Sequence, residues 1–321
     1  MSYNVIAADN VDKAAIDLLA QSADINIIAQ GNLSRDQLLA VLPEADGLII
    51  RSTTKADAAL LEQAAKLKII ARAGVGVDNV DLNAATEKGI VVVNTPDGNT
   101  ISTAEYTFGL MLALARHIAP AYQDLKEGRW ERKAFTGVEL KGKTLGIVGF
   151  GRIGRAVAKR ALAFEMNIVA FDPYIAADIA EDFGARLVDL DTLFAVSDFI
   201  TLHSVITDET KHMINAETIG KMKKGVRIVN AARGALINDA DLAAAIKSGQ
   251  VGGAALDVYT VEPPAADNPL IGLAGVLHTP HLAASTSDAQ INVGVDAARL
   301  VVEGLTTGHY TNVCNPAVVQ K

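Results

Sequence analysis

A glycine-rich segment, Gly149-Phe150-Gly151-Arg152-Ile153-Gly154, constrains the fold of this chain more than any other feature. It follows a short apolar run at residues 145–148 and precedes a stretch in which apolar residues recur at helical spacing, which is the context that makes a G-x-G-x-x-G pattern informative. Gly149 permits a tight turn, Gly151 lets the backbone approach a pyrophosphate, and Gly154 lets the helix pack closely on the strand. The helix N-terminus then offers free N–H groups to phosphates, so the segment predicts a dinucleotide-binding α/β unit.

An acidic residue stands where such a unit needs one. Asp172 closes the next apolar run, residues 168–171, about 20 residues beyond the glycines, where a carboxylate can hydrogen-bond the adenosine ribose. The same carboxylate would repel a 2′-phosphate, and the next residues, Pro173 and Tyr174, carry no compensating positive charge. The sequence therefore favours NAD over NADP.

Short runs rich in Val and Ile alternate with longer Ala- and Leu-rich stretches, which is the pattern of βαβ units. In the first third, strands are expected at residues 4–8, 24–29, 47–50, 68–71 and 90–93, with helices near 11–21, 34–42, 56–65 and 83–88. A second series has strands at 144–149, 167–171, 185–188, 199–202, 227–230, 252–257 and 276–279, with helices near 153–164, 190–195, 216–221 and 239–248. The first series predicts an open, mostly parallel sheet covered on both faces, and the second predicts a longer α/β domain.

Two further helices are expected outside these series. Residues 101–126 are apolar over much of a helical circumference, which predicts one long helix buried within the chain or against another subunit. Residues 289–303 predict a last helix before a tail rich in Gly and Thr.

Composition limits the partners of the chain. Its 321 residues carry 29 Lys and Arg against 37 Asp and Glu, a net charge of −8, which argues against binding to nucleic acid. The single cysteine, Cys314, can form no intrachain disulfide and no multi-cysteine metal site. The N-terminus has no basic region before its apolar run, and the longest uncharged stretch, residues 268–287, is interrupted by prolines and histidines. We therefore expect a cytoplasmic protein with neither a membrane partner nor a bound metal.

Three side chains in the second series have the chemistry of a hydride-transfer site. Arg233 follows a predicted strand at the sheet edge where α/β proteins bind ligands, and its guanidinium can hold a carboxylate bidentately. His281 follows the last predicted strand, and Glu262 lies in a loop stiffened by Pro263 and Pro264. A carboxylate beside an imidazole fixes its tautomer and favours its charged form, so such a pair can take and return a proton. Taken singly, each of the three residues is more often structural.

Basic side chains elsewhere point to an anionic substrate. Arg51, which is followed by Ser52, and Arg72 each end a predicted strand of the first domain, and Arg132 lies in the segment 130–133. A solvated charge is the competing interpretation for each of them.

With the glycine motif, Arg233, Glu262 and His281 in this order, the chain resembles the D-2-hydroxyacid dehydrogenases, in particular the members that oxidise 3-phosphoglycerate. The resemblance spans roughly residues 48–288 and is specific at residues 72–79, 94–99, 130–133, 230–234, 255–258 and 281–286. It implies an α/β fold with two doubly wound parallel-sheet domains. In this arrangement an NAD-binding Rossmann domain, residues 99–286, is inserted into a flavodoxin-like substrate domain formed by residues 1–98 and 287–321. It also implies a short form, without the regulatory domain into which long members of the family continue.

The resemblance also assigns roles to residues. Arg233 would bind the substrate carboxylate and keto oxygen, His281 would be the acid/base, Glu262 would orient His281, and Asp257 would accept the nicotinamide carboxamide. The implied NAD contacts are Val75, Gly149, Gly151, Arg152, Ile153, Gly154, Asp172, Ser204, Ala231, Arg233, Asp257, His281 and Ala284. The implied substrate contacts are Arg51, Ser52, Arg72, Gly74, Val75, Arg132, Arg233 and His281, and a homodimer is implied as well. Two positions depart from the pattern: Val75 stands where relatives often carry Thr, and Ala283 where they often carry Gly.

The expected reaction is the NAD-dependent oxidation of 3-phosphoglycerate to 3-phosphohydroxypyruvate, the first step toward serine. A broader reductase of 2-keto acids such as glyoxylate or hydroxypyruvate is one alternative, and it would not need a phosphate site. A binding protein that senses NADH on the same fold is an alternative of another class. The complete set of Arg233, Glu262 and His281 argues against that alternative, because sensing needs no acid/base.

Overall fold

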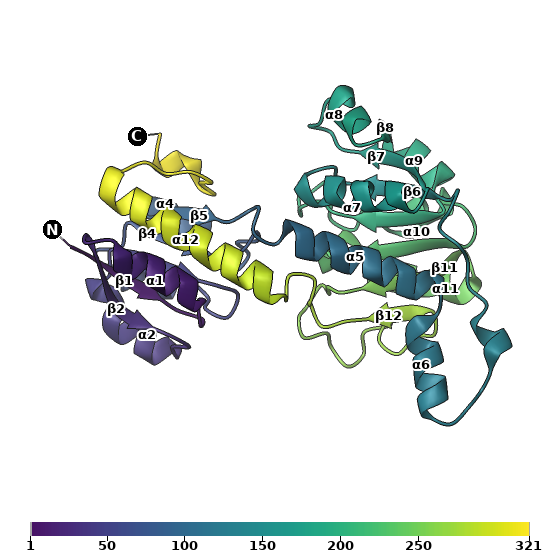
Figure 1. Cartoon of the computed structure of the whole chain (residues 1–321), viewed down its shortest axis with the longest axis horizontal. Coiled ribbons are helices and arrows are strands. Elements are labelled where there is room, and N and C mark those ends of the chain that lie inside the picture. Colours follow the sequence, from purple (N-terminus) through teal and green to yellow (C-terminus); the bar gives the residue numbers. More distant parts are fainter. Residues whose placement is uncertain (1, 321) are drawn as a thin grey trace. The chain divides into compact units, whose positions relative to one another are not determined.

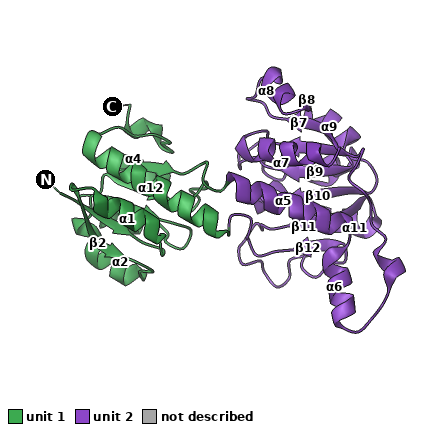
Figure 2. Ribbon diagram, viewed as in Figure 1, with its two compact units in different colours: residues 1–99, 285–321 green, residues 100–284 purple. Residues whose placement is uncertain are grey.

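The computed structural model describes residues 2–320 and forms two compact units (Figure 2). Unit 1 comprises Met1–Asn99 and Ser285–Lys321, and unit 2 comprises Thr100–Ala284. Unit 1 is thus built from both ends of the chain, which passes between the units twice. The sequence predicts the boundaries after residues 98 and 286, and the structure divides the units after Asn99 and Ala284.

Unit 1 contains a five-stranded parallel sheet in the order β2-β1-β3-β4-β5, and Figure 1 labels four of these strands, β1, β2, β4 and β5. Its strands are β1 (Tyr3–Ala7), β2 (Ile25–Gln30), β3 (Gly47–Ile50), β4 (Ile69–Arg72) and β5 (Val91–Asn94). Helices α1 (Lys13–Gln21) and α12 (Ser287–Thr307) share a core with alternate strand residues such as Val5 and Ile49. Helices α2 (Arg35–Val41), α3 (Ala58–Glu62) and α4 (Leu82–Glu87) share a second core with the intervening ones, such as Ile6 and Leu48. Because successive strand residues face opposite sides, both faces of the sheet are covered.

Unit 2 contains a seven-stranded parallel sheet in the order β12-β11-β10-β9-β6-β7-β8. Its strands are β6 (Thr144–Val148), β7 (Asn167–Phe171), β8 (Ala185–Leu187), β9 (Phe199–Leu202), β10 (Val226–Asn230), β11 (Val251–Leu256) and β12 (Val276–His278). Helices α5 (Thr100–Ala115), α7 (Arg152–Ala163) and α8 (Ala177–Asp182) pack into one core, and helices α9 (Leu190–Val196), α10 (Ala216–Gly220) and α11 (Asp239–Ser248) into the other. The order is that of a Rossmann sheet with one added strand, and that of unit 1 is flavodoxin-like, so the predicted fold class is confirmed.

The single long helix predicted over residues 101–126 is wrong, because the structure contains two helices there. Helix α5 ends at Ala115 and α6 spans Ile118–Lys126, and between them His117 adopts a left-handed conformation with φ of 53°. Pro120 explains the break, since in a continuous helix its ring would clash with the carbonyl of Arg116. Helix α5 is largely buried, whereas Ile118, Tyr122 and Leu125 of α6 are more than half exposed.

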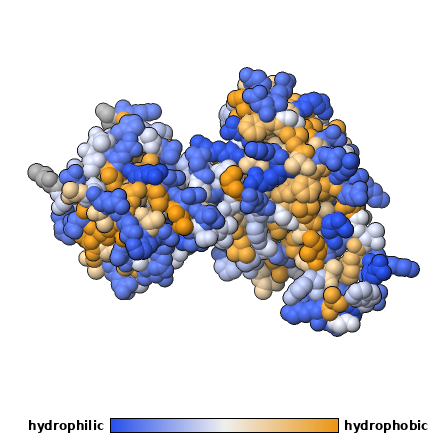
Figure 3. Space-filling model, viewed as in Figure 1, coloured by the Kyte–Doolittle hydropathy of each residue, from blue (hydrophilic) through white to orange (hydrophobic). Residues whose placement is uncertain are grey.

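The surface of unit 2 carries further apolar side chains. Figure 3 shows apolar residues gathered over the α5 and α7 region of the face that it draws. Ile101 in α5, Leu162 in α7 and Phe164 directly after α7 are exposed. Within residues 2–320, no helix has the length and apolar character needed to cross a membrane. The same residues contain no group of three His, Cys, Asp or Glu side chains placed to hold a metal ion.

Candidate active site

The glycine-rich loop lies where the order of strands in unit 2 reverses, between β6 and β9. Gly149 has φ of 90°, and its N–H donates to the carbonyl of Phe171 at 2.8 Å. A Cβ on Gly149 would lie 2.7 Å from the carbonyl carbon of His203 and 2.8 Å from the Ser204 nitrogen. The loops that follow β6 and β9 are therefore in direct contact, at the carboxyl edge where open α/β sheets bind their ligands.

The start of α7 has the shape of a phosphate cradle. A Cβ built on Gly151 would meet no atom within 4 Å, so open space faces the backbone there. A Cβ on Gly154 would lie 2.3 Å from the carbonyl oxygen of Gly149, so that only glycine lets the helix pack this closely on the loop. The helix begins at Arg152 and presents its N-terminal N–H groups next to this open space.

Asp172 is held in place directly after β7. Its Oδ2 accepts a hydrogen bond from Phe150 N at 2.8 Å, and its Oδ1 accepts one from Tyr174 N at 2.9 Å. The carboxylate is thereby attached to the glycine loop itself, with lone pairs left for a ribose hydroxyl. The loop, the helix start and the carboxylate together fit an adenine dinucleotide. Two further predicted NAD contacts lie at the same edge of the sheet: Ser204, whose nitrogen faces Gly149, and Ala231, which directly follows β10.

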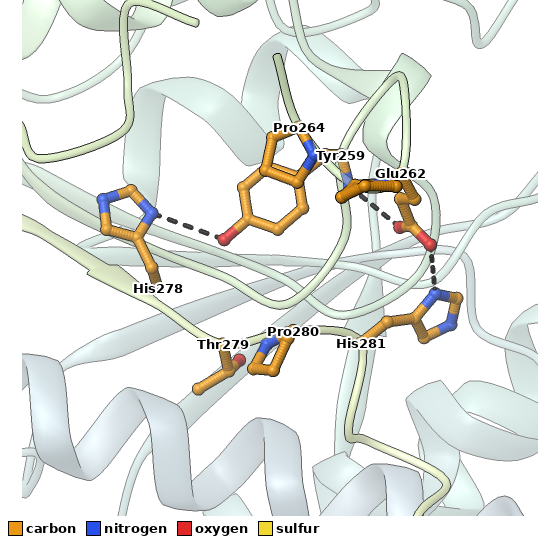
Figure 4. A pocket seen from close by; sticks show the side chains of 8 residues that line it. Tyr259, Glu262, Pro264, His278, Thr279, Pro280 and His281 are labelled. Atoms are coloured by element: carbon orange, nitrogen blue, oxygen red, sulfur yellow. Dashed lines mark hydrogen bonds and ion pairs between the residues drawn. The ribbon is translucent and has the colours of Figure 1, made fainter. Parts of the chain in front are cut away.

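The candidate catalytic residues follow three neighbouring strands of the same sheet. Arg233 lies beyond β10, Glu262 beyond β11 and His281 beyond β12. The structure brings two of them into contact, because His281 Nδ1 and Glu262 Oε2 are 2.7 Å apart (Figure 4). The other carboxylate oxygen, Oε1, accepts a hydrogen bond from Tyr259 N at 3.1 Å. Half of the His281 side chain is exposed, so its ring is tethered on one side and reachable on the other.

Asp257 has a role that sequence reasoning missed, since it anchors the loop that carries His281. This aspartate is fully buried, and its carboxylate accepts hydrogen bonds from Thr279 Oγ1 at 2.6 Å and from the N–H groups of Leu282 and Ala283, both at 2.8 Å. His281 N also donates to the Asp257 carbonyl at 2.8 Å. These bonds hold His281 at φ of 55°, in the left-handed region that few residues other than glycine adopt.

The loop of Arg233 packs directly on the loop of Glu262. A Cβ on Gly234 would lie 1.9 Å from the carbonyl carbon of Tyr259, so only glycine allows this approach. The buried Asn230 shapes the turn: its Nδ2 donates to the Arg233 carbonyl at 2.9 Å, and its Oδ1 accepts from Ala232 N at 3.0 Å. The Arg233 guanidinium donates to the Ala232 carbonyl at 2.8 Å.

A pocket of about 400 Å³ lies beside the Glu262–His281 pair. Residues 259, 262–264 and 278–281 line it, and Figure 4 shows the Tyr259 hydroxyl directed at His278. The Tyr259 oxygen and His278 Nδ1 are 3.4 Å apart. Burial raises the pKa of Tyr259 and lowers that of His278, so both are neutral near pH 7. Sequence reasoning missed these two side chains, although each lies at or next to the end of a predicted strand.

The predicted substrate residues in the first part of the chain lie at the carboxyl edge of the unit 1 sheet. The Arg72 guanidinium lies over Gly74, where a Cβ would be 1.4 Å from Arg72 Nη1, so Gly74 makes room for it. Val75 follows, and its carbonyl accepts a hydrogen bond from Asn94 Nδ2 at 2.6 Å. Arg51 and Ser52 directly follow β3.

Arg132 belongs to a short helical turn of unit 2. It begins the short 3-10 helix η2 (Arg132–Phe135), between α6 and β6 in the chain. Its side chain is exposed, and within residues 2–320 the structure shows no hydrogen bond or ion pair that links it to Arg233, Glu262 or His281.

Comparison with known proteins identifies the family. Residues 108–283 match the model of the D-isomer specific 2-hydroxyacid dehydrogenase, NAD binding domain. The chain is 51% identical over 298 residues to a D-3-phosphoglycerate dehydrogenase of Archaeoglobus fulgidus and 47% identical over 322 residues to one of Synechocystis. These matches cover 93% and 99% of this chain but 56% and 58% of the two relatives, so the chain spans little more than half of their length. A hydroxypyruvate reductase of Thermotoga maritima is 49% identical over 305 residues, which are 94% of this chain and 98% of that protein.

Solved structures agree with this match. A glyoxylate reductase from Paecilomyes thermophila superposes with a TM-score of 0.87 at 30% identity, covering 100% of this chain and 99% of that one. A D-lactate dehydrogenase from Escherichia coli superposes with a TM-score of 0.81 at 31% identity, covering 97% and 99%. The chain therefore belongs to the family of D-isomer specific 2-hydroxyacid dehydrogenases, and unit 2 contains the NAD-binding domain of that family.

Proposed function

We propose that the protein catalyses the NAD-dependent oxidation of 3-phosphoglycerate to 3-phosphohydroxypyruvate, the reaction that leads to serine. The observation that carries this proposal is the Glu262–His281 pair, whose Nδ1 and Oε2 atoms are 2.7 Å apart at the carboxyl edge of the NAD-binding unit. The names of the Archaeoglobus and Synechocystis relatives support the choice of substrate. Arg51, Ser52, Arg72, Gly74, Val75 and Arg132 are assigned to binding of the anionic substrate.

In the proposed mechanism His281 is the general base. Its Nδ1 faces Glu262, which favours the tautomer with the proton on Nδ1 and leaves Nε2 to accept the proton of the substrate hydroxyl. Glu262 stabilises the imidazolium that results, and Arg233 holds the substrate carboxylate. NAD, when bound, would accept the hydride from the substrate carbon that carries this hydroxyl. The hydrogen bonds from the loop to Asp257 keep His281 in one position before the substrate arrives, which lowers the entropic part of the barrier.

Contacts to NAD are assigned to residues of both units. In unit 1 the residue is Val75. In unit 2 they are the glycine loop with Arg152 and Ile153, then Asp172, Ser204, Ala231, Arg233, Asp257, His281 and Ala284. The buried Asp257 carboxylate already accepts three hydrogen bonds, so a contact with the nicotinamide carboxamide would use a remaining lone pair of Oδ2. We further propose that unit 1 is the substrate domain, that the protein acts in the cytoplasm, and that it forms a homodimer. The exposed apolar residues of α6 support the dimer.

Replacement of His281 tests the mechanism. Asn tolerates the left-handed conformation of this position, so His281→Asn should fold and still bind NADH. Loss of the base should lower kcat by about 10²- to 10⁴-fold. Turnover of 3-phosphoglycerate and NADH binding by fluorescence are the two measurements, and His309→Asn, at an exposed site, is the matched control. Near-normal turnover by His281→Asn would contradict the assignment.

A second candidate function is the reduction of hydroxypyruvate, which is favoured by the Thermotoga relative because the chain covers nearly all of that protein. The two functions differ in the need for a phosphate site. If the first proposal is correct, kcat/KM for 3-phosphoglycerate exceeds that for glycerate, and Arg51→Gln removes most of the difference. Equal kcat/KM for both acids, with no effect of Arg51→Gln on their ratio, would favour the reductase.

A further inference from the structure

Unit 1 has its own point where the strand order reverses, between β1 and β3. In the order β2-β1-β3-β4-β5, the chain turns to one side after β1 and continues on the other side with β3. Ligands of open α/β sheets bind outside the carboxyl ends of the strands at such a point. The residues there are Asp9 and Asn10 after β1 and the segment 51–54 after β3, and Ala8 N donates to the Ile49 carbonyl at 2.9 Å beside them.

A buried carboxylate organises this point. Asp9 is 5% exposed, and its Oδ2 accepts hydrogen bonds from Arg51 N at 2.8 Å and Thr54 N at 3.0 Å. Its Oδ1 accepts a hydrogen bond from Thr54 Oγ1 at 2.7 Å. Asp9 and Asn10 have φ of 58° and 49°, so two consecutive residues are held in the left-handed region. Asp and Asn adopt this region more readily than other residues, and the hydrogen bonds to Asp9 fix the turn in it.

The segment that Asp9 binds is also fixed from its other side. Asn79 Nδ2 donates to the carbonyls of Arg51 at 2.8 Å and Thr54 at 2.6 Å. Both ends of the 51–54 segment are thus fixed, while the side chains of Ser52 and Thr53 remain exposed. Within residues 2–320, the structure gives the Arg51 guanidinium no carboxylate partner. The segment therefore combines a fixed backbone with an unpaired positive charge.

We propose that Asp9 is a positioning residue for substrate binding: its carboxylate fixes the 51–54 segment so that Arg51 and Ser52 recognise the anionic 2-hydroxy acid. The inference deepens the proposed function and rests on its assignment of these two residues to the substrate. Asp9 itself touches no substrate, since its carboxylate is buried and engaged by backbone and hydroxyl donors. A carboxylate suits the task because it accepts all three hydrogen bonds, whereas an amide would direct its NH₂ group at one of the donors.

A double-mutant cycle tests whether Asp9 acts through Arg51. Asp9→Asn should raise KM for 3-phosphoglycerate about tenfold and leave kcat within about twofold, because loss of a charge-assisted hydrogen bond loosens the segment. Arg51→Gln should raise KM at least as much, and the double variant should be no worse than Arg51→Gln alone. Additive effects in the cycle, or an unchanged KM in Asp9→Asn, would overturn the inference.

Second variants and controls separate positioning from general damage to the fold. Thr54→Val removes one hydrogen bond to Asp9 and should raise KM, as Asp9→Asn does. Thr54→Ser keeps the hydroxyl and should leave KM at the wild-type value. Asp46→Asn, which removes a comparable acceptor for Asn4 N in the same unit, should leave KM unchanged. The NADH dissociation constant should not change in any of these variants. If Thr54→Val and Asp46→Asn shift KM equally, Asp9 has only a structural role.

The assignment of 3-phosphoglycerate as the substrate can fail while the inference about Asp9 still holds. If the wild-type protein turns over hydroxypyruvate but not 3-phosphoglycerate, the proposed function fails. The cycle is then measured with hydroxypyruvate, whose carboxylate is also an anion. Non-additive changes in KM would still support positioning by Asp9, and additive changes would refute it.

Discussion

At the scale of single residues, His203 connects the cofactor loop with the core of unit 2. Its Nε2 is 3.0 Å from Thr201 Oγ1, and its Nδ1 is buried without a hydrogen-bond partner among residues 2–320. Burial lowers the pKa of His203 from 6.5 to about 4, so the native protein holds a neutral imidazole. The backbone of this residue is also what Gly149 packs against, so its protonation acts at the wall of the cofactor loop.

The free energy of unfolding should therefore fall with acidification. The unfolded state binds the His203 proton near pH 6.5 and the native state only near pH 4, so the stabilisation is complete above pH 6.5 and is lost progressively down to pH 4. The full loss is about 3 kcal/mol. Urea unfolding at pH values from 7 to 4 measures this loss, and His203→Gln should reduce the total loss of unfolding free energy over that range by about 3 kcal/mol. His212→Gln, at a partly buried site, should keep the wild-type slope, and a wild-type slope in His203→Gln would contradict the prediction.

Contacts between site residues could be predicted from the sequence where a local motif specifies them. They could not be predicted where the fold brings distant segments together. The glycine loop with Asp172 and the pairing of Glu262 with His281 are found together in the structure. Asp9 and Asp257 were not predicted as anchors, because their donors arrive from loops about 45 and 25 residues away in the sequence. No single-sequence pattern marks an aspartate whose partners are backbone N–H groups of a distant turn.

At the scale of elements, helix α7 shows how two glycines of one motif serve different purposes. Gly151→Ala adds a Cβ to open space, so the fold should tolerate it, whereas the phosphate would meet the new methyl group. Gly154→Ala adds a Cβ that would lie 2.3 Å from the Gly149 carbonyl oxygen, so the helix must move. We expect Gly151→Ala to weaken NADH binding about tenfold with unchanged stability. Gly154→Ala should lower the free energy of unfolding by about 1–3 kcal/mol.

The same substitution at Gly220 is the control for both variants, because a Cβ there would meet no atom within 4 Å and the backbone is not left-handed. NADH fluorescence titration and urea unfolding separate the two effects. Loss of stability in Gly151→Ala together with full stability in Gly154→Ala would contradict this account of the helix.

The sequence predicts which strands and helices are present better than it predicts the residues at which they begin and end. Every expected strand is present, because short Val- and Ile-rich runs between helical stretches leave few alternatives. The helix over residues 101–126 failed because apolar periodicity continues through a break that one proline imposes. Helix α8 was not expected, since only Ala180 of its six residues is buried and it has no apolar period to detect.

At the scale of the whole molecule, the net charge of −8 makes the arginines at strand ends locally positive sites on an acidic protein. Arg51 and Arg72 lie at the carboxyl edge of the unit 1 sheet and Arg233 at that of the unit 2 sheet. On an acidic surface, such sites raise the local concentration of a small anion. The order of the strands, which the alternating pattern does not specify, is what places each arginine at a strand end that can bind a ligand.

The proposed homodimer makes a prediction at this scale. Ile118, Tyr122 and Leu125 form one exposed face of α6, with 55%, 67% and 57% of each residue accessible. An amphipathic helix that presents its apolar face to solvent in the monomer has that face available for a second copy. Leu125→Glu should therefore halve the mass in sedimentation equilibrium from twice 33.7 kDa to 33.7 kDa, without lowering the melting temperature at high protein concentration by more than a few degrees. Val319→Glu replaces an apolar residue that is 46% exposed in unit 1 and should leave the mass at the dimer value. A wild-type chain that sediments as a monomer, or a Leu125→Glu variant that remains a dimer, would remove α6 from the interface.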